Sequence, residues 1–360
     1  MNRKIATDYV DVDNNSFDYI RIICACTIFL GHFLTHFHYQ SGVLDFTAYF
    51  IRGVPVFFCL SGFFCARSMD RYSSREFIKK RFFRLYPSLW VCLIINTMII
   101  ALTYFKWPTI KEFILYLLTQ FTVFQFYTGD WLRGYGVGAP NGALWTISTE
   151  VQFYILLVLF AGFMKKWSLK IWITVIAVLA AFSLILGQFG ERYLPAIGNK
   201  LLMVSVFPFL YIFLFGVMCY WHRDRLIPLL MRYCIPLCIV YTLWNILPDT
   251  LTAGIGGGVR YNVVTTILLM MTLISVGFRM GRHRMKREWS YHFYLYHMVV
   301  MNFFVHNITG SVNGITQMLI LLITTFVITV AFAIFSGGFI DGVLSKKIQK
   351  FIFGNQSVVK

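Results

Sequence analysis

Charged residues are scarce in this sequence. They make up 13% of its 360 residues, about half of the roughly 25% usual in soluble domains. Hydrophobic residues make up 58%, and the mean hydropathy of +0.68 is too high for these side chains to be buried inside a soluble globule. The composition excludes a soluble enzyme, a collagen-like protein and a disordered chain. It indicates an all-α polytopic membrane protein.

Paired cysteine motifs, linkers and repeats are also missing. The eight cysteines are scattered through apolar runs, with no pair of CxxC motifs and no Cys/His spacing suited to zinc. We therefore expect no disulfide framework and no metal site. No Pro- or Ser-rich linker divides the chain. Residues 1–16 contain three aspartates and no signal-peptide cleavage pattern, so the first apolar run is expected to remain as a transmembrane helix.

Ten apolar segments are long enough to cross a bilayer, which takes about 20 mostly apolar residues. They are Phe17–Phe37, Val43–Ala66, Phe83–Phe105, Leu144–Met164, Leu169–Phe189, Leu201–Trp221, Pro228–Leu247, Val259–Phe278, Tyr291–Thr309 and Thr316–Phe339. An eleventh stretch, Phe113–Tyr127, has 15 residues, and we expect it to be interfacial or re-entrant.

The positions of the basic residues predict the orientation of these spans. With the N-terminus inside, 23 of the 32 Lys and Arg residues lie in cytoplasmic segments and five in outer segments, as the positive-inside rule requires. The net charge of +17 is then mostly a cytoplasmic surface, and no nucleic-acid partner is expected. The sequence predicts about ten transmembrane helices with both termini cytoplasmic. It divides into an N-terminal segment 1–16, a transmembrane domain 17–340 and a tail 341–360.

Ionisable residues inside membrane spans are costly and usually functional. Arg21 and His32 are 11 residues apart, which at about 100° and 1.5 Å per residue places them on one helix face, roughly 16 Å apart. Arg21 is expected near the cytoplasm and His32 in the outer half. This spacing suits a ligand with an anionic end at the inner surface and a reactive end deep in the membrane. Alternatively, Arg21 snorkels and pairs with Asp18, and His32 only makes an interhelical hydrogen bond.

Two further sets of charged residues have both a functional and a structural interpretation. Glu150, in the fourth predicted span, is expected at the depth of His32, where its carboxylate could orient the imidazole. It could instead pair with Arg52 of the second span. Arg81 and Arg84 are spaced i,i+3 where the third span begins, so their guanidiniums could hold a phosphate or pyrophosphate. The positive-inside rule alone would also account for both arginines.

Five motifs follow one another along the chain. They are Arg21-x10-His32, Phe57-Phe58-Cys59-Leu60-Ser61-Gly62-Phe63, Arg81-Phe82-Phe83-Arg84 followed by Tyr86-Pro87, Trp145-Thr146-Ile147-Ser148-Thr149-Glu150 with Phe153-Tyr154, and Ser290-Tyr291 with Tyr294-Leu295 and His297. In this order they resemble the acyltransferase-3 family of membrane acyltransferases, found in bacterial envelope-polysaccharide O-acetylation. Thr146 replaces the family's usual Ser, and Asp341-Gly342 stands where a Glu-Pro pair often follows the last span.

The resemblance implies an acetyl-CoA-dependent O-acetyltransferase, multi-pass in the bacterial inner membrane. It would move an acyl group, usually acetyl, from cytoplasmic acyl-CoA to a hydroxyl of an envelope carbohydrate such as O-antigen or exopolysaccharide. The acceptor is expected to be lipid-linked or periplasm-facing.

The resemblance also implies roles for particular residues. The catalytic residues would be His32 as general base, Glu150, which orients it, and Arg21. The acyl-CoA would bind Arg81, Arg84, Arg21, Tyr86 and Ser61, and the acceptor would contact Arg52, Trp145 and His297.

Two other classes of protein compete with this interpretation. A transporter or flippase would also have many spans with buried charges, but no half-chain repeat and no pair of matched broken helices is detectable. A non-catalytic assembly component could keep the fold, but it would not need Arg21, His32 and Glu150 together.

Overall fold

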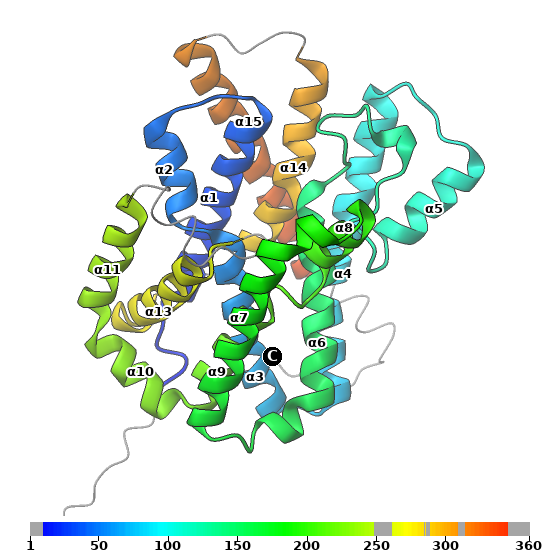
Figure 1. The fold of residues 1–360 in the computed structure, drawn as a ribbon. Coiled ribbons are helices and arrows are strands. Elements are labelled where there is room, and N and C mark those ends of the chain that lie inside the picture. Colours follow the sequence, from blue (N-terminus) through cyan, green and yellow to red (C-terminus); the bar gives the residue numbers. More distant parts are fainter. Residues whose placement is uncertain (1–9, 248–260, 284, 286–288, 309–313, 345–360) are drawn as a thin grey trace, which may run out of the picture. The chain divides into compact units, whose positions relative to one another are not determined.

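The computed structural model describes residues 10–247, 261–283, 285, 289–308 and 314–344, and within them every regular element is a helix (Figure 1). The chain forms two compact units that interleave in the sequence. Unit 1 comprises Met1–Cys24, Ile51–Arg71 and Gln152–Met285, and unit 2 comprises Ala25–Phe50, Tyr72–Val151 and Lys286–Lys360. The division passes through α1 (Phe17–His36) and α6 (Trp145–Met164), so each of these helices contributes to both units.

The other helices belong to one unit each. Those of unit 1 are α3 (Gly53–Arg71), α7 (Leu169–Tyr193), α8 (Ala196–Val204), α9 (Leu210–Trp221), α10 (Arg223–Arg232), α11 (Cys234–Ile246) and α13 (Val263–Arg279). Those of unit 2 are α2 (Gly42–Phe50), α4 (Ser74–Thr103), α5 (Ile110–Gln120), α14 (Ser290–Asn307), α15 (Ile315–Ser336), the short 3-10 helices η1 (Asp130–Leu132) and η2 (Gly142–Leu144), and the π-helix η3 (Gly337–Leu344).

The structure confirms an all-helical, multi-pass chain but not the count of ten spans. In the described residues six helical segments are long and apolar enough to cross a membrane, or seven if the pair α10 and α11, bent by 67°, is one span. Each predicted span contains a helix, but some are interrupted. Pro208 lies in the break between α8 and α9, and the ring of Pro236 prevents α10 from continuing straight into α11, because proline clashes with the carbonyl four residues earlier.

The expected domain boundaries fall partly on residues that are not described. The tail 341–360 lies outside the described residues except for 341–344, and the N-terminal segment 1–16 is described from residue 10. These boundaries, and the cytoplasmic position of both termini, remain predictions.

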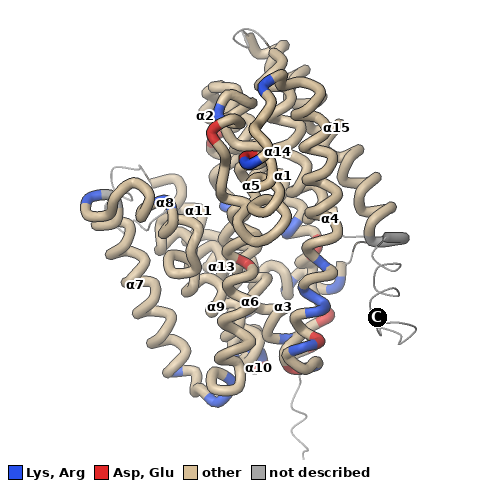
Figure 2. The backbone as a smooth tube through the Cα atoms, turned by 90° about the vertical axis from the view of Figure 1, so that its right-hand side faces the viewer, with Lys and Arg blue, Asp and Glu red and all other residues tan. Residues whose placement is uncertain are grey.

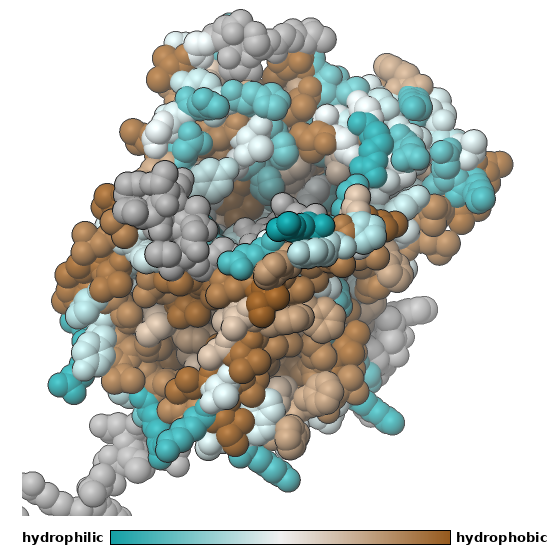
Figure 3. Space-filling model, viewed as in Figure 1, coloured by the Kyte–Doolittle hydropathy of each residue, from teal (hydrophilic) through white to brown (hydrophobic). Residues whose placement is uncertain are grey.

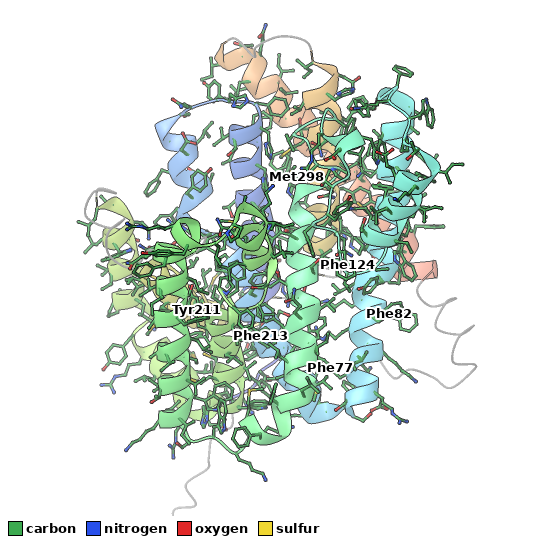
Figure 4. All side chains as sticks on the ribbon, turned by 45° about the vertical axis from the view of Figure 1, so that its right-hand side comes forward. Phe77, Phe82, Phe124, Tyr211, Phe213 and Met298 are labelled. Carbon is green, nitrogen blue, oxygen red and sulfur yellow. The ribbon has the colours of Figure 1, made fainter. Side chains whose placement is uncertain are left out.

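In unit 1, α3 and α9 pack backbone against backbone. A Cβ atom on Gly62 would collide with the carbonyl oxygen of Phe213, and one on Gly216 would collide with that of Cys59. Only glycine allows so close an approach of two helices. Phe213, labelled in Figure 4, also stacks on Phe153 of α6 with ring centroids 4.5 Å apart. The glycine of the Leu-Ser-Gly-Phe motif therefore has a packing role.

Unit 1 also exposes many apolar side chains along α7. Ile173, Val178 and Ile185 are each more than half exposed, and Figure 3 shows a hydrophobic surface over this helix. Such a surface is unstable in water and suits contact with lipid.

In unit 2, α14 packs against α15, α4 and η2, and it fixes the loop that leads into α6. The Asn302 side chain donates to the carbonyl of Ala139 (2.9 Å) and accepts from the backbone N–H of Val137 (3.0 Å). Asn141 donates to the carbonyl of Leu295 (2.8 Å). These bonds give the start of α6 a defined position on α14.

The short helix α5 begins at a capping box, in which Thr109 and Glu112 satisfy each other's backbone N–H groups. Its 11 residues extend about 16 Å, roughly half the 30 Å hydrocarbon core of a bilayer. The length agrees with the expectation that Phe113–Tyr127 does not span the membrane.

Candidate active site

The helix α1 is continuous over Phe17–His36, as the interpretation of Arg21 and His32 requires. The two residues fall in different units, His32 in unit 2 and Arg21 in unit 1, and each is described within its own unit.

Two other imidazoles lie beside His32. The ring of His36, one turn later on α1, is nearly parallel to it, with centroids 5.4 Å apart. The ring of His297 from α14 is tilted against it, with centroids 5.3 Å apart. His32 is half-buried. The structure thus brings together two residues that the sequence assigned to the site, His32 and His297, although 265 positions separate them.

His297 is held in a single tautomer. Its Nδ1 lies 2.6 Å from the carbonyl oxygen of Tyr294, which can only accept, so Nδ1 carries the proton. The other ring nitrogen, Nε2, is buried and has no hydrogen-bond partner among the described residues, and the side chain is 1% exposed. In the neutral ring this nitrogen presents a bare lone pair.

The Tyr294 hydroxyl links α14 to the start of α6. It donates to the carbonyl of Ala143 (2.8 Å) and lies 2.9 Å from the Thr146 hydroxyl. Thr146, which replaces the usual Ser, therefore keeps a hydroxyl in this contact. The half-buried Trp145 begins α6 directly before it.

Glu150 is half-buried on α6, and its described surroundings include Tyr291 of α14. Tyr291 lies within electrostatic range of Glu150, and also of Arg84 and Tyr86 of α4. Three of the predicted site residues thus lie within electrostatic range of one tyrosine. That Glu150 orients His32 remains a prediction.

The basic segment at the start of α4 follows a capping box formed by Ser73 and Glu76. Figure 2 shows Lys and Arg residues along this part of the helix. Arg81 is 8% exposed, and its guanidinium lies over the ring of Phe77 at 5.4 Å, whereas Arg84 is exposed. The two members of the predicted clamp therefore differ in their access to a solvated phosphate.

The neighbouring Tyr86 is buried among aromatic rings. It stacks on Phe82 with centroids 4.7 Å apart and meets Trp90 edge-on at 5.7 Å. Phe77 and Phe82, both labelled in Figure 4, lie on successive turns of α4. These aromatic contacts bury the Tyr86 side chain, whereas Arg84, two residues earlier on the same helix, stays exposed.

The remaining predicted residues lie in unit 1. Arg21 is 7% exposed; its guanidinium is 3.8 Å from the Asp18 carboxylate and lies over the ring of Phe64 at 4.7 Å. The pairing with Asp18 in the structural interpretation is thus present. Ser61 is buried, with its hydroxyl 3.7 Å from the Cys65 thiol.

Arg52 precedes α3 and is half-buried. Its charge lies within electrostatic range of the phenol groups of Tyr211 on α9 and Tyr241 on α11. The structure places Arg52 in unit 1 and Glu150 in unit 2, and the pairing of these two residues remains a prediction.

Sequence reasoning missed one buried polar pair in unit 2. The Ser88 hydroxyl of α4 lies 3.1 Å from Nε2 of His292, and both side chains are almost fully buried. His292 lies inside the last motif, which was the available signal. Among the described residues no group of three or more His, Cys, Asp or Glu side chains has an arrangement that could hold a metal ion.

The fold and the site define a multi-pass helical membrane protein in which helices far apart in the sequence contribute neighbouring imidazoles. The family model described as "Acyltransferase domain" matches residues 14–334, nearly the whole chain. The chain belongs to this family, acyltransferase-3, which confirms the resemblance drawn from the motifs and supports a membrane acyltransferase.

Nodulation protein 10 of Rhizobium leguminosarum bv. viciae is 27% identical to the chain over 310 residues, which cover 80% of this chain and 83% of that protein. No solved structure matches the chain significantly.

Proposed function

We propose that the protein transfers an acyl group, most simply acetyl, from cytoplasmic acyl-CoA to a hydroxyl of a cell-envelope carbohydrate in the bacterial inner membrane. Family membership supports acyl transfer in a membrane. The observation that carries the site is the contact between the His32 ring and His297, whose Nε2 is buried and lacks a partner among the described residues. A transporter or flippase is not favoured, because the matching family is one of acyltransferases.

In this proposal His32 is the general base. It takes the proton of the acceptor hydroxyl as the oxygen attacks the thioester carbonyl; the carbon–sulfur bond then breaks, and the CoA thiolate leaves and receives the proton. A well-placed general base contributes about 10²–10⁴ in rate.

His297 is the residue that positions His32. The ring centroids are 5.3 Å apart, and Nε2 of His297 makes no hydrogen bond to a described residue, so an N–H···N bond to His32 would form only when one of the two rings turns. The Nε2 lone pair of His297 would then accept the N–H of the His32 imidazolium and stabilise its charge as the proton is transferred. The sequence assigned this orienting role to Glu150, and the two assignments are separated by the experiment that opens the Discussion.

The donor would bind at the start of α4. The exposed Arg84 is accessible to a phosphate, and Arg81, Tyr86, Arg21 and Ser61 complete the set implied by the family. Acetyl-CoA would be a co-substrate, with no metal required. The carbohydrate acceptor, lipid-linked or facing the periplasm, would contact Trp145 and Arg52; the sequence also assigned it His297, which in this proposal positions His32 instead.

Purified protein in nanodiscs, incubated with radiolabelled acetyl-CoA and envelope glycans, tests the proposal. We expect label in the glycan with the wild-type chain and transfer about 10²–10⁴-fold slower with His32→Ala, although that variant should still insert and bind acetyl-CoA. His306→Ala on α14, which contacts Tyr104 and Tyr135, is the matched control and should transfer normally. Transfer by His32→Ala at the wild-type rate would contradict the proposal.

A further inference from the structure

In unit 1 the helices α10 and α11 meet at a bend of 67°, and α13 packs against both of them (Figure 1). α10 has 10 residues and is therefore about 15 Å long, half the hydrocarbon thickness of a bilayer. It contains the arginines Arg223, Arg225 and Arg232 and one acid, Asp224 in its first turn, whereas the sequence of α11 has no charged residue. A short basic helix that turns away from an apolar one is typical of the membrane interface.

The exposed face of α10 combines positive charge with apolar side chains. Arg225 and Arg232 are seven residues apart, which is two helical turns, so they lie on one face about 10 Å apart. Both are exposed, and Leu229, which is 50% exposed, lies between them. The opposite face, with Ile227 and Leu230, is buried. Such a face suits the region of a bilayer where anionic headgroups meet the acyl chains.

A second helix adds an arginine at the end of α10. Arg279, the last residue of α13, is exposed and donates through Nη1 to the carbonyl of Met231 (3.1 Å). The next residue is Arg232, whose guanidinium lies 5.9 Å from the centre of the Tyr233 ring. None of the ion pairs between described residues involves Arg232 or Arg279. Two arginines from different helices therefore lie beside the same bend, and their charges can be neutralised by one anion.

An exposed apolar stripe begins at this bend and follows α11. Its residues recur every three or four positions and are each more than half exposed; they are Ile235, Ile239, Leu243 and Ile246. The stripe is about 16 Å long. Tyr233, 48% exposed at its start, is a residue type enriched at the level of the headgroups. A pair of arginines at one end of an apolar stripe favours a ligand with an anionic head and a long apolar tail over a soluble anion.

We propose that the junction of α10 and α11 binds one anionic phospholipid. Its phosphate would accept hydrogen bonds from Arg232 and Arg279, and its acyl chains would lie along the stripe on α11. The positive-inside rule predicts this end of unit 1 on the cytoplasmic side, where the leaflet carries a negative surface potential. The bound lipid would bridge α10 and α13 and stabilise the bend.

Native mass spectrometry of the full-length protein tests this site. From micelles with equal amounts of phosphatidylglycerol and phosphatidylcholine of the same acyl chains, the protein should retain one phosphatidylglycerol with at least tenfold preference. Both lipids have a phosphate, but the cationic choline group is repelled by the arginines. Arg232→Gln and Arg279→Gln should each lower the preference about fivefold, equivalent to about 1 kcal/mol. Arg232→Lys, which keeps the charge, should retain most of it.

The matched control is Lys166→Gln, which removes an exposed charge from the loop between α6 and α7 and should keep the wild-type preference. Equal retention of the two lipids, wild-type preference in either Arg232→Gln or Arg279→Gln, or the same loss in Lys166→Gln would overturn the inference. Displacement of phosphatidylglycerol by sn-glycerol 3-phosphate at equal concentration would assign the arginines to a soluble phosphate and overturn it as well. The measurement requires no acyl transfer, so its outcome is independent of the proposed function.

Discussion

Replacing His297 by Asn tests whether a second imidazole positions the base. The Asn amide can still donate to the Tyr294 carbonyl, which His297 now contacts through Nδ1 at 2.6 Å, but it lacks an acceptor at the position of Nε2. The substitution therefore removes the proposed partner of His32 and keeps the contact that anchors residue 297 to its own helix.

The expected loss follows from the hydrogen bond that is removed. A hydrogen bond to a charged group is worth about 1.5–3 kcal/mol, and here the charge forms on His32 only as the proton is transferred. At about 1.36 kcal/mol per tenfold change in rate, kcat should fall roughly 10- to 150-fold. The KM for acyl-CoA should not change, because the lost interaction is absent from the ground state.

The assay is steady-state acyl transfer by purified variants, with kcat and KM measured for donor and acceptor. His297→Gln, whose longer amide places an oxygen near the position of Nε2, should recover part of the rate. His297→Asn combined with His32→Ala should be no slower than His32→Ala alone, because the two residues act as one unit. His306→Asn, on the same helix, should retain wild-type kinetics.

Two results would refute this account. A loss confined to the KM for the acceptor would make His297 a substrate contact, as the sequence implied, and not a positioning residue. A double variant slower than His32→Ala would show that His297 acts independently of His32. If Glu150→Gln instead lowers kcat and shows this non-additivity with His32→Ala, the orienting role belongs to Glu150.

Three further variants test packing, donor binding and the loop before α6. Gly216→Ala should lower the melting temperature in detergent, because overpacking typically costs about 1–3 kcal/mol. Gly162→Ala is the control and should not lower it, because nothing lies within 4 Å of a Cβ atom at that position. Equal melting temperatures for the two variants would contradict the packing argument. Arg84→Ala should raise the KM for acyl-CoA about tenfold and leave kcat unchanged, because a hydrogen bond to a charged group is worth about 1.5–3 kcal/mol. An unchanged KM would mean that Arg84 does not bind the donor and that the positive-inside rule alone accounts for it. Asn302→Leu should lower both the melting temperature and kcat and expose the loop before α6 to proteolysis, and wild-type protease resistance would refute the anchoring role.

The helical class was predictable because bilayer thickness sets a length that apolar runs reveal directly. The number of spans was not. Leu201–Trp221 and Pro228–Leu247 are as apolar as the unbroken segments, yet the first is interrupted at Pro208 and the second is bent near Pro236. A hydropathy average depends on the composition of a whole window of residues. A helix break can depend on a single proline, which lacks a backbone N–H and whose ring clashes with the carbonyl four residues earlier. The two prolines could have indicated these breaks, but the span prediction relied on the number of apolar residues in each segment.

The candidate site was predictable residue by residue but not as an arrangement. The motifs identified His32 and His297 separately, and only the fold shows that their rings meet. Helical periodicity relates positions on one helix, such as Arg21 and His32, and it contains no information about a partner 265 residues away. Nε2 of His297 has no partner among the described residues because Nδ1 is the nitrogen that meets the backbone carbonyl of its own helix and because of the packing around the ring, and a motif records neither.

The same motifs also combine packing with chemistry, which affects how mutational loss should be interpreted. Gly62 lies beside Ser61 in the Leu-Ser-Gly-Phe motif, yet its role in the structure is to let α3 approach the carbonyl of Phe213. Thr146 lies four residues before Glu150, and its hydroxyl meets that of Tyr294. An inactive variant at either position would not by itself indicate a catalytic residue. A role in the reaction needs a folded variant whose kcat falls while its melting temperature and donor KM do not change. That combination is expected at His32, the base, and at His297, which positions it.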